Sequence, residues 1–163
     1  MSALSSPSPE ALLHAAGLEL PQPPVPRGRY APLCIASAEG RFVGVSGQTC
    51  RVAGIPIAGT CGLDVDIDAA RHAARVAMLN ALAALATAAP GGLAAVKQVV
   101  RLRGFVRSTA DFTEHPAVLD AASDVLVIAF PDQSLPARSA LGVASLPGGA
   151  VIEIEIDAIV ATG

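Results

Sequence analysis

Residues 135–157 read LPARSALGVASLPGGAVIEIEID, and two β-strands are predicted within this stretch. The first begins near Arg138 and continues through the apolar run 140–143. The second covers residues 151–156 and alternates strictly between apolar and acidic residues, which places its glutamates on one face and its isoleucines on the other. If these strands are neighbours in one sheet, a fixed cation and a carboxylate meet where a small anionic substrate could lie beside a base or an activated water.

The sequence upstream alternates between short strands, turns and helical segments. The predicted elements are strands over residues 33–37 and 41–46 with a turn at Ala38-Glu39-Gly40, a loop over 51–62, a helix from a cap at Asp66 or Asp68 to residue 89, a strand over 96–106, and a helix over 111–130 with Pro116 near its start. With the C-terminal strands, the order is β-β-α-β-α-β-β. This order predicts an α+β fold, a two-layer sandwich of a mixed β-sheet with two main helices on one face.

The first 26 residues are expected to form an N-terminal extension to a single domain over residues 27–163. Ser8-Pro9-Glu10 is typical of a helix start, so residues 11–16 are predicted to be a short helix that Gly17 ends. Residues 18–26 hold four prolines and are predicted to be an extended lead into the domain.

Composition favours an assembly of several subunits. The chain has 163 residues, of which 52% are apolar and only 15% are charged, against about 25% in a typical domain. So few charges indicate that another subunit covers part of the surface. The net charge of −3 argues against nucleic acid as a partner. Arg101, Arg103 and Arg107 share one strand face, for which a solvated surface is favoured over an RNA track.

Motifs for metals, nucleotides and membranes are missing from the sequence. Cys34, Cys50 and Cys61 form no CxxC pair, and the three histidines lack ligand spacing, so we expect no metal site and no disulfide framework. No glycine-rich fingerprint for a nucleotide or a dinucleotide occurs. The N-terminus does not resemble a signal peptide, and no apolar run is long enough to cross a membrane. Isolated thiols favour a cytoplasmic location.

Arg138 and Glu153 are the first candidates for a binding site. A guanidinium offers a planar fork that matches a carboxylate, so Arg138 could bind an anionic ligand. From the local sequence alone, an exposed arginine or a pair with Asp132 is the simpler explanation. Glu153 could face a pocket and orient a water molecule. The alternative for Glu153 is a solvated acidic face of the sheet.

Ser46, Gly47 and Tyr30 are weaker candidates. Ser46 and Gly47 end a predicted strand, where a hydroxyl can donate to a ligand and backbone N–H groups can bind an anion. No histidine lies near Ser46 in the sequence, so a hydrolase triad is not supported. Tyr30 is the only tyrosine and could stack over a substrate, or simply belong to the core or the surface.

These segments occur together in an order that resembles the RidA/YjgF family, also called the endoribonuclease L-PSP family. The resemblance spans about residues 27–160 and depends on Tyr30, the SGQ at 46–48, the PARS at 136–139 and the LP at 146–147 followed by IEIE at 152–155. The stretch GFVRSTADFT at 104–113 is more similar to the divergent branch described as chorismate-mutase-like endoribonucleases.

The resemblance implies a chorismate-mutase-like fold of the bacterial trimeric type, with clefts between the subunits of a homotrimer. It implies hydrolysis of 2-imino acids to 2-keto acids and ammonia, without metal or organic cofactor. Arg138 would clamp the carboxylate of a small ligand and Glu153 would position the attacking water. Ser46, Gly47 and Tyr30 would line the cleft.

Two residues depart from the family pattern. Ala140 stands where deaminase members often carry a cysteine, whose contribution could come from its backbone, so Ala140 stays a candidate substrate-binding residue. Pro116 stands near the place of a common asparagine. Two alternatives to the deaminase therefore remain. One is a trimer that binds a small carboxylate without turnover, and the other is an endoribonuclease or translation inhibitor, which the acidic balance disfavours.

Overall fold

The computed structural model describes residues 39–161. The predicted N-terminal helix, the proline-rich lead, Tyr30 and the predicted strand at 33–37 lie outside the described residues, as does the predicted boundary between the extension and the domain.

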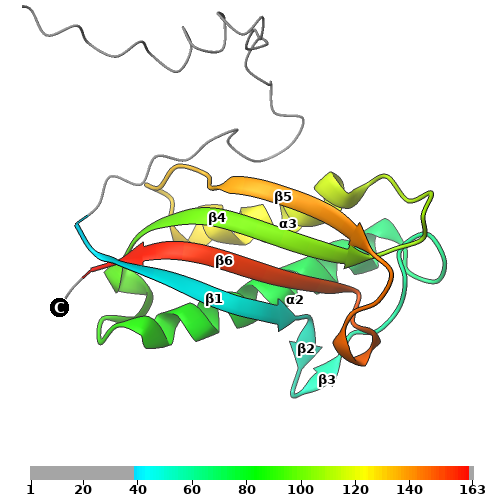
Figure 1. The fold of residues 1–163 in the computed structure, drawn as a ribbon, viewed down its shortest axis with the longest axis horizontal. Coiled ribbons are helices and arrows are strands. Elements are labelled where there is room, and N and C mark those ends of the chain that lie inside the picture. The colour runs from blue at the N-terminus through cyan, green and yellow to red at the C-terminus, as the bar shows by residue number, and fades with distance from the viewer. Residues whose placement is uncertain (1–38, 162–163) are drawn as a thin grey trace, which may run out of the picture.

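A four-stranded mixed sheet forms one layer of the molecule (Figure 1). Its strands are, in spatial order, β1 (Arg41–Thr49), β6 (Ile152–Val160), β4 (Val96–Arg107) and β5 (Ala137–Val143). Strand β6 runs antiparallel to both of its neighbours, whereas β5 runs parallel to β4. The predicted α+β sandwich with a mixed sheet is therefore confirmed.

The two C-terminal strands are not neighbours, so the condition under which Arg138 and Glu153 would meet within one sheet edge is not met. Strand β4 lies between β5 and β6. The physical reason is that the chain leaves β4, passes through a helix and returns as β5, which pairs in parallel with β4. The chain then crosses the end of β4 and enters β6 on the opposite side of that strand. At that end the Arg107 N–H donates to the Val151 carbonyl on one side, and the Ser108 N–H donates to the Val143 carbonyl on the other.

Two helices cover one face of the sheet (Figure 1), and we call the opposite face the open face. Helix α2 (Ile67–Leu85) is capped by Asp66, whose carboxylate accepts a hydrogen bond from the Ala69 N–H at 2.8 Å. Helix α3 (His115–Ala129) carries Pro116 in its first turn. The helix was predicted to begin at residue 111 but begins at His115. In the first turn the proline costs no helical hydrogen bond, because the N–H groups there have no partner within the helix. The other helical elements within residues 39–161 are the 3-10 turns Ala86–Ala88, Gly92–Ala95 and Pro147–Gly149.

The predicted loop at 51–62 contains a short hairpin, which corrects that prediction. Its strands are β2 (Arg51–Val52) and β3 (Ile55–Pro56). The two connecting residues, Ala53 and Gly54, have φ values of 50° and 81°. Positive φ at both positions is the geometry of a tight hairpin turn.

Small residues bring the helices close to the sheet. The α2 side chains with no exposed surface are mostly alanines, namely Ala70, Ala73, Ala74, Ala77 and Ala81. On β4, a Cβ atom at Gly104 would overlap the methyl carbons of Leu119 on α3, so the glycine sets the distance between this strand and the helix. The core therefore forms without a tryptophan, from aliphatic side chains at close approach.

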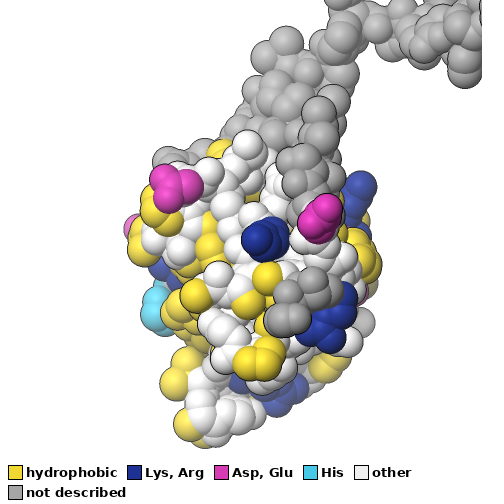
Figure 2. All heavy atoms as spheres, turned by 90° about the vertical axis from the view of Figure 1, so that its left-hand side faces the viewer, with side chains coloured by type: hydrophobic (Ala, Val, Ile, Leu, Met, Phe, Trp, Pro, Cys, Tyr) yellow, Lys and Arg dark blue, Asp and Glu magenta, His cyan; other side chains and the backbone are white. Residues whose placement is uncertain are grey.

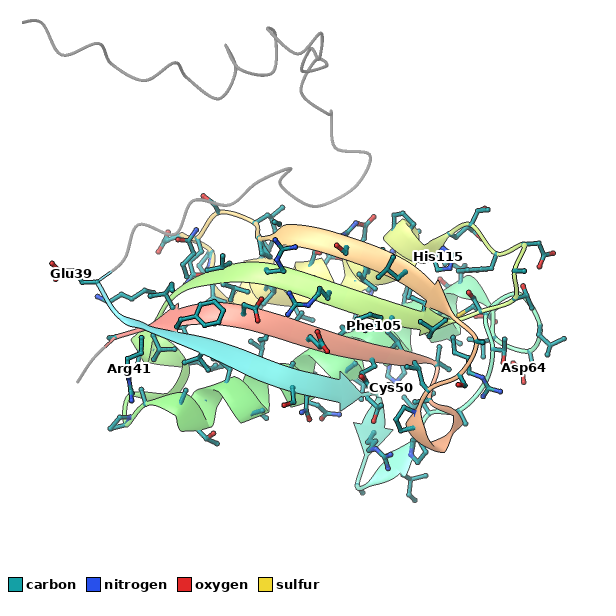
Figure 3. All side chains as sticks on the ribbon, in the orientation of Figure 1. Glu39, Arg41, Cys50, Asp64, Phe105 and His115 are labelled. Carbon is teal, nitrogen blue, oxygen red and sulfur yellow. The ribbon has the colours of Figure 1, made fainter. Side chains whose placement is uncertain are left out.

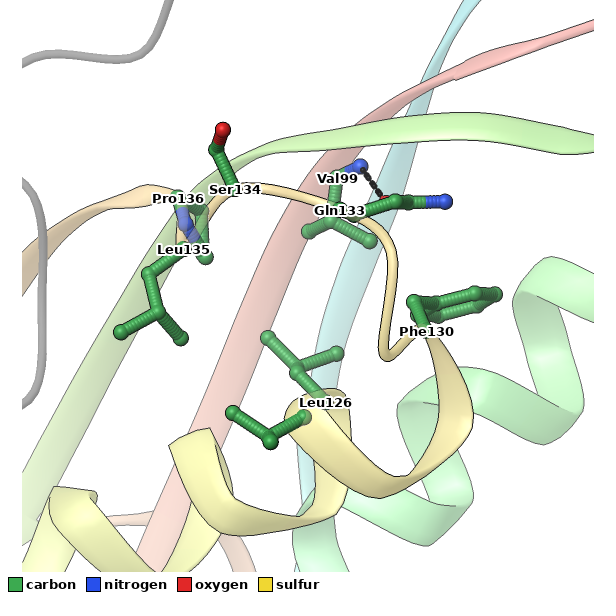
Figure 4. Close-up of a pocket in the computed structure, with 8 residues that line it drawn as sticks. Val99, Leu126, Phe130, Gln133, Ser134, Leu135 and Pro136 are labelled. Atoms are coloured by element: carbon green, nitrogen blue, oxygen red, sulfur yellow. Dashed lines mark hydrogen bonds between the residues drawn. The ribbon is translucent and has the colours of Figure 1, made fainter.

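Gln133 replaces a strand partner along the first part of β4. Pairing with β5 begins only at Arg101. Before that point, the Gln133 side chain accepts a hydrogen bond from the Val99 N–H at 3.0 Å (Figure 4). It also donates one to the Val96 carbonyl at 3.1 Å. The cavity beside it, against Leu126, has about 10 Å³ of space, which is room for about one water molecule. This cavity is therefore too small to bind a substrate.

Candidate functional site

Arg138 faces helix α3 and is almost fully buried. It pairs with Leu102 in the β4–β5 register. Its NH1 donates to the Asp120 carboxylate at 2.9 Å and to the Ser123 hydroxyl at 3.0 Å, and its NH2 lies 3.5 Å from the Pro116 carbonyl. The Arg138 side chain is 2% exposed and that of Asp120 is 22% exposed. Helix α3 therefore both orients the Arg138 guanidinium and supplies the carboxylate that pairs with its charge.

Ala140 lies on the same face of β5 as Arg138. It pairs with Gly104, whose own face packs on α3. Because the side chain of alanine is a single methyl group, Ala140 has only that group and its backbone to offer to a ligand.

Glu153 lies on the open face of β6, together with Gly47 of β1. A Cβ atom at Gly47 would overlap the Glu153 carboxylate, so the missing side chain leaves the space in which this carboxylate lies. Ser46 and Gly47 form a β-bulge opposite Glu155, because the register shifts between Val45 and Gln48. Bulges commonly re-aim side chains beside binding sites.

The predicted site residues therefore fall into two groups within one chain. Arg138 and Ala140 belong to the face that packs on α3, whereas Glu153 and Gly47 belong to the open face. Strand β4 separates the two groups, and Glu153 pairs with Phe105, further along β4 than the Leu102 that pairs with Arg138. One small ligand could not touch both groups of the same chain.

Arg103 pairs with two of the three carboxylates on the acidic face of β6. Arg103 donates from Nε to the Glu155 carboxylate at 2.8 Å and from NH1 to the Asp157 carboxylate at 3.0 Å. The hydrogen bond to Glu155 and the contacts with Asp157 raise the pKa of Arg103 above its ordinary value. The predicted basic face is interrupted by this pairing, which weakens it further as an RNA track.

A third group was not predicted from the sequence. Ser108, just beyond β4, has its hydroxyl 3.1 Å from Nε2 of His115, the first residue of α3. The His115 ring lies edge-on to Phe112, with centroids 5.0 Å apart and planes at 81°. Burial lowers the pKa of His115 below its ordinary value of 6.5. A cavity of about 350 Å³ opens beside this pair, with Gly142 and Val143 among its walls.

This pair escaped sequence analysis because it depends on where α3 begins. A helix starting at residue 111 would have placed His115 inside its second turn, away from the end of β4. The available signal was Pro116, whose preference for the first helical turn marks His115 as a helix start. Figure 3 shows His115 at the end of the molecule where β4 and β5 finish.

Grouped metal-ligating side chains and long apolar helices are the features that would indicate a metal ion or a membrane. Within residues 39–161, no three His, Cys, Asp or Glu side chains are grouped so that they could hold a metal ion. Among the helices of that same part, none combines the length and the apolar character needed to cross a membrane.

Comparison with known proteins gives consistent matches over most of the chain. A family model described as "YjgF/chorismate mutase-like, putative endoribonuclease" matches residues 10–152. Protein TCP17 of Trypanosoma cruzi is 35% identical over 158 residues, which cover 95% of this chain and 96% of that protein.

Two solved structures share both fold and sequence. A protein of unknown function from Agrobacterium tumefaciens, Atu1372, has a TM-score of 0.72 and 33% identity, covering 94% of this chain and 92% of its own. A "putative endoribonuclease" from Shewanella oneidensis has a TM-score of 0.70 and 33% identity, covering 94% of this chain and all of its own (100%). By its fold and by these matches, the chain belongs to the YjgF/chorismate mutase-like family.

Proposed function

We propose that this protein hydrolyses 2-imino acids to 2-keto acids and ammonia in a cleft between two copies of the chain. The observation that carries the proposal is the separation of Arg138 and Glu153 on opposite faces of one sheet. Each residue has a defined position, since α3 holds Arg138 and the space above Gly47 holds Glu153. A ligand bound by both would need Arg138 from one copy and Glu153 from another.

The exposed surface supports an assembly, which we propose to be a homotrimer. Phe42 of β1 and Leu141 of β5 are 65% and 49% exposed. Both pair with residues that place them on the open face, where another copy could cover them. Figure 2 shows the end of the molecule where β1 begins, and apolar side chains there are interspersed with separate charges rather than gathered in a basic patch.

Hydrolysis of a 2-imino acid needs an oriented substrate, one water molecule and a proton acceptor. The substrate carboxylate would pair with the Arg138 guanidinium, which Asp120 and Ser123 hold in place. The Glu153 carboxylate would take a proton from a water molecule while the oxygen of that water attacks the imine carbon. Proton transfer to nitrogen then lets the carbon–nitrogen bond break, which gives the 2-keto acid and ammonia. We propose that this occurs in the cytoplasm, where the buried free thiols of Cys50 and Cys61 would stay reduced.

Imine hydrolysis tests this proposal directly. An amino-acid oxidase generates 2-iminobutyrate in the cuvette, and semicarbazide traps the imine that remains. We expect the wild type to speed imine loss, Arg138→Met to abolish the effect, and Arg75→Ala, an exposed arginine of α2, to behave as wild type. The ion pair with Asp120 would also exist if Arg138 served the fold alone, so circular dichroism must show that Arg138→Met is folded.

Two further variants test Glu153. Glu153→Gln keeps the shape of the side chain but removes the proton acceptor, so we expect binding of 2-ketobutyrate to remain and turnover to stop. Gly47→Ala should displace the same carboxylate, because its new methyl group overlaps that position, and should also lower turnover. A wild type that binds 2-ketobutyrate but hydrolyses no imine would establish the alternative, a trimer that binds a small carboxylate without turnover.

A further inference from the structure

The cavity at the ends of β4 and β5 has a composition different from that of the proposed imine cleft. Its eight lining residues include Ser108, Thr109, Phe112, His115, Gly142 and Val143. Among the eight, His115 is the one side chain that titrates near neutral pH. None of them belongs to the Arg138 or Glu153 group, so whatever this cavity does is independent of the proposed imine hydrolysis.

The Ser108–His115 pair has the geometry of a hydroxyl and its base. The oxygen and Nε2 are 3.1 Å apart, within the range for proton transfer between a nucleophile and a base. Burial lowers the pKa of His115, so the ring is neutral at pH 7 and able to accept the hydroxyl proton. The edge-on contact with Phe112 holds the ring in orientation, a task that a carboxylate performs in a full triad.

Gly142 keeps the pair accessible from the cavity. A Cβ atom at this position would lie 2.6 Å from His115 Nε2 and 2.9 Å from the Ser108 oxygen. Any other residue would therefore press on both reacting atoms. With glycine, the wall in front of the hydroxyl is backbone only, and about 350 Å³ of space adjoins it, enough for a small acyl group.

The N-terminus of helix α3, which carries the positive end of the helix dipole, lies beside the Ser108–His115 pair. His115 is its first residue, and the N-cap residue Glu114 makes no side-chain capping hydrogen bond. The helix is 15 residues long, so its N-terminal dipole would favour negative charge that develops on an acyl oxygen near the pair.

We infer that Ser108 is a nucleophile and His115 its general base, and that this cavity accepts small esters or other activated acyl compounds. The Ser108 oxygen bonds to the acyl carbon while its proton moves to His115 Nε2. The alkoxide leaves with that proton as an alcohol. Water then attacks the acyl-serine, passes a proton through His115 back to the Ser108 oxygen, and releases a carboxylic acid.

Covalent labelling of the full-length protein tests the inference. The probe is a small fluorophosphonate, which transfers its phosphonyl group to an activated serine with loss of fluoride. We expect one label per chain, located on Ser108 by mass spectrometry of the peptides. Ser108→Ala should lose it, whereas Ser139→Ala, on the neighbouring strand, should keep it. Hydrolysis of 4-nitrophenyl acetate by the same variants would follow the same order.

His115 must also control the labelling rate. Because general bases typically contribute about 100-fold or more, His115→Asn should slow labelling by about 100-fold. His115→Gln serves as a second variant if His115→Asn does not fold. The wild-type labelling rate should rise with pH through a pKa below 6.5 and then level off. Absence of label on Ser108 in the wild type, or an unchanged rate in a folded His115 variant, would overturn the inference.

Discussion

Arg138 and Asp120 offer a quantitative test of how strand β5 is attached to helix α3. Their contact is short, 2.9 Å, and the arginine side chain is only 2% exposed. Removing one partner of a buried ion pair costs about 3–5 kcal/mol, because the other charge stays buried without compensation. Asp120 is 22% exposed, so water can partly replace it, and we expect Asp120→Ala to cost about 3 kcal/mol.

The matching experiment is a double-mutant cycle of Asp120→Ala with Arg138→Met, which keeps most of the arginine stem. The four proteins are unfolded in urea at pH 7 and at one protein concentration, since assembly would make stability depend on concentration. We expect a coupling energy of about 2 kcal/mol, within the range for residues in one hydrogen-bond network. A coupling energy below about 0.5 kcal/mol would refute the conclusion that Arg138 and Asp120 stabilise the fold as a coupled, buried pair.

Three further predictions concern the core, the histidine and the thiols. Gly104→Ala should lower the free energy of unfolding by about 1–3 kcal/mol, because its methyl group overlaps Leu119. When it is combined with Leu119→Ala, the total loss measured by urea denaturation should be less than the sum of the two single losses, and additive losses would contradict the contact. Burial lowers the pKa of His115 below the unfolded value of 6.5, so the unfolded chain binds the proton more readily and the free energy of unfolding falls as the pH drops through 6.5. His115→Asn should reduce the loss of this free energy between pH 7 and pH 5, and an unchanged loss would contradict the lowered pKa of His115. Burial raises the pKa of Cys61 to about 11, so iodoacetamide at pH 8 should modify this thiol only after unfolding. Modification of Cys61 in the native protein, detected by mass spectrometry, would contradict its burial.

The sequence contains clear signals for elements whose periodicity is local. Strand β6 follows from the strict alternation between Ile152 and Asp157, because one face of that strand is fully buried. The cap at Asp66 is equally local, since it needs only one carboxylate and the N–H groups of the next turn. Both features were predictable without any knowledge of tertiary contacts.

Features that depend on distant parts of the chain were not predictable in the same way. Strand neighbours depend on the parallel crossover through α3, and residue pattern alone does not distinguish β4 from β5 as the partner of β6. The β2–β3 turn was missed because Ala53, unlike asparagine or glycine, gives no signal for positive φ. The contacts of Arg138 and His115 were hidden for a similar reason, since each partner comes from an element placed by the tertiary fold.

The side chain of Gln133 has a consequence for how copies of this protein meet in concentrated solution. An exposed strand edge is a template on which a foreign strand can add. The first part of β4 extends beyond its parallel neighbour, yet the Gln133 amide bonds to main-chain groups of Val96 and Val99 there. One amide therefore shields this edge against intermolecular strand addition and aggregation.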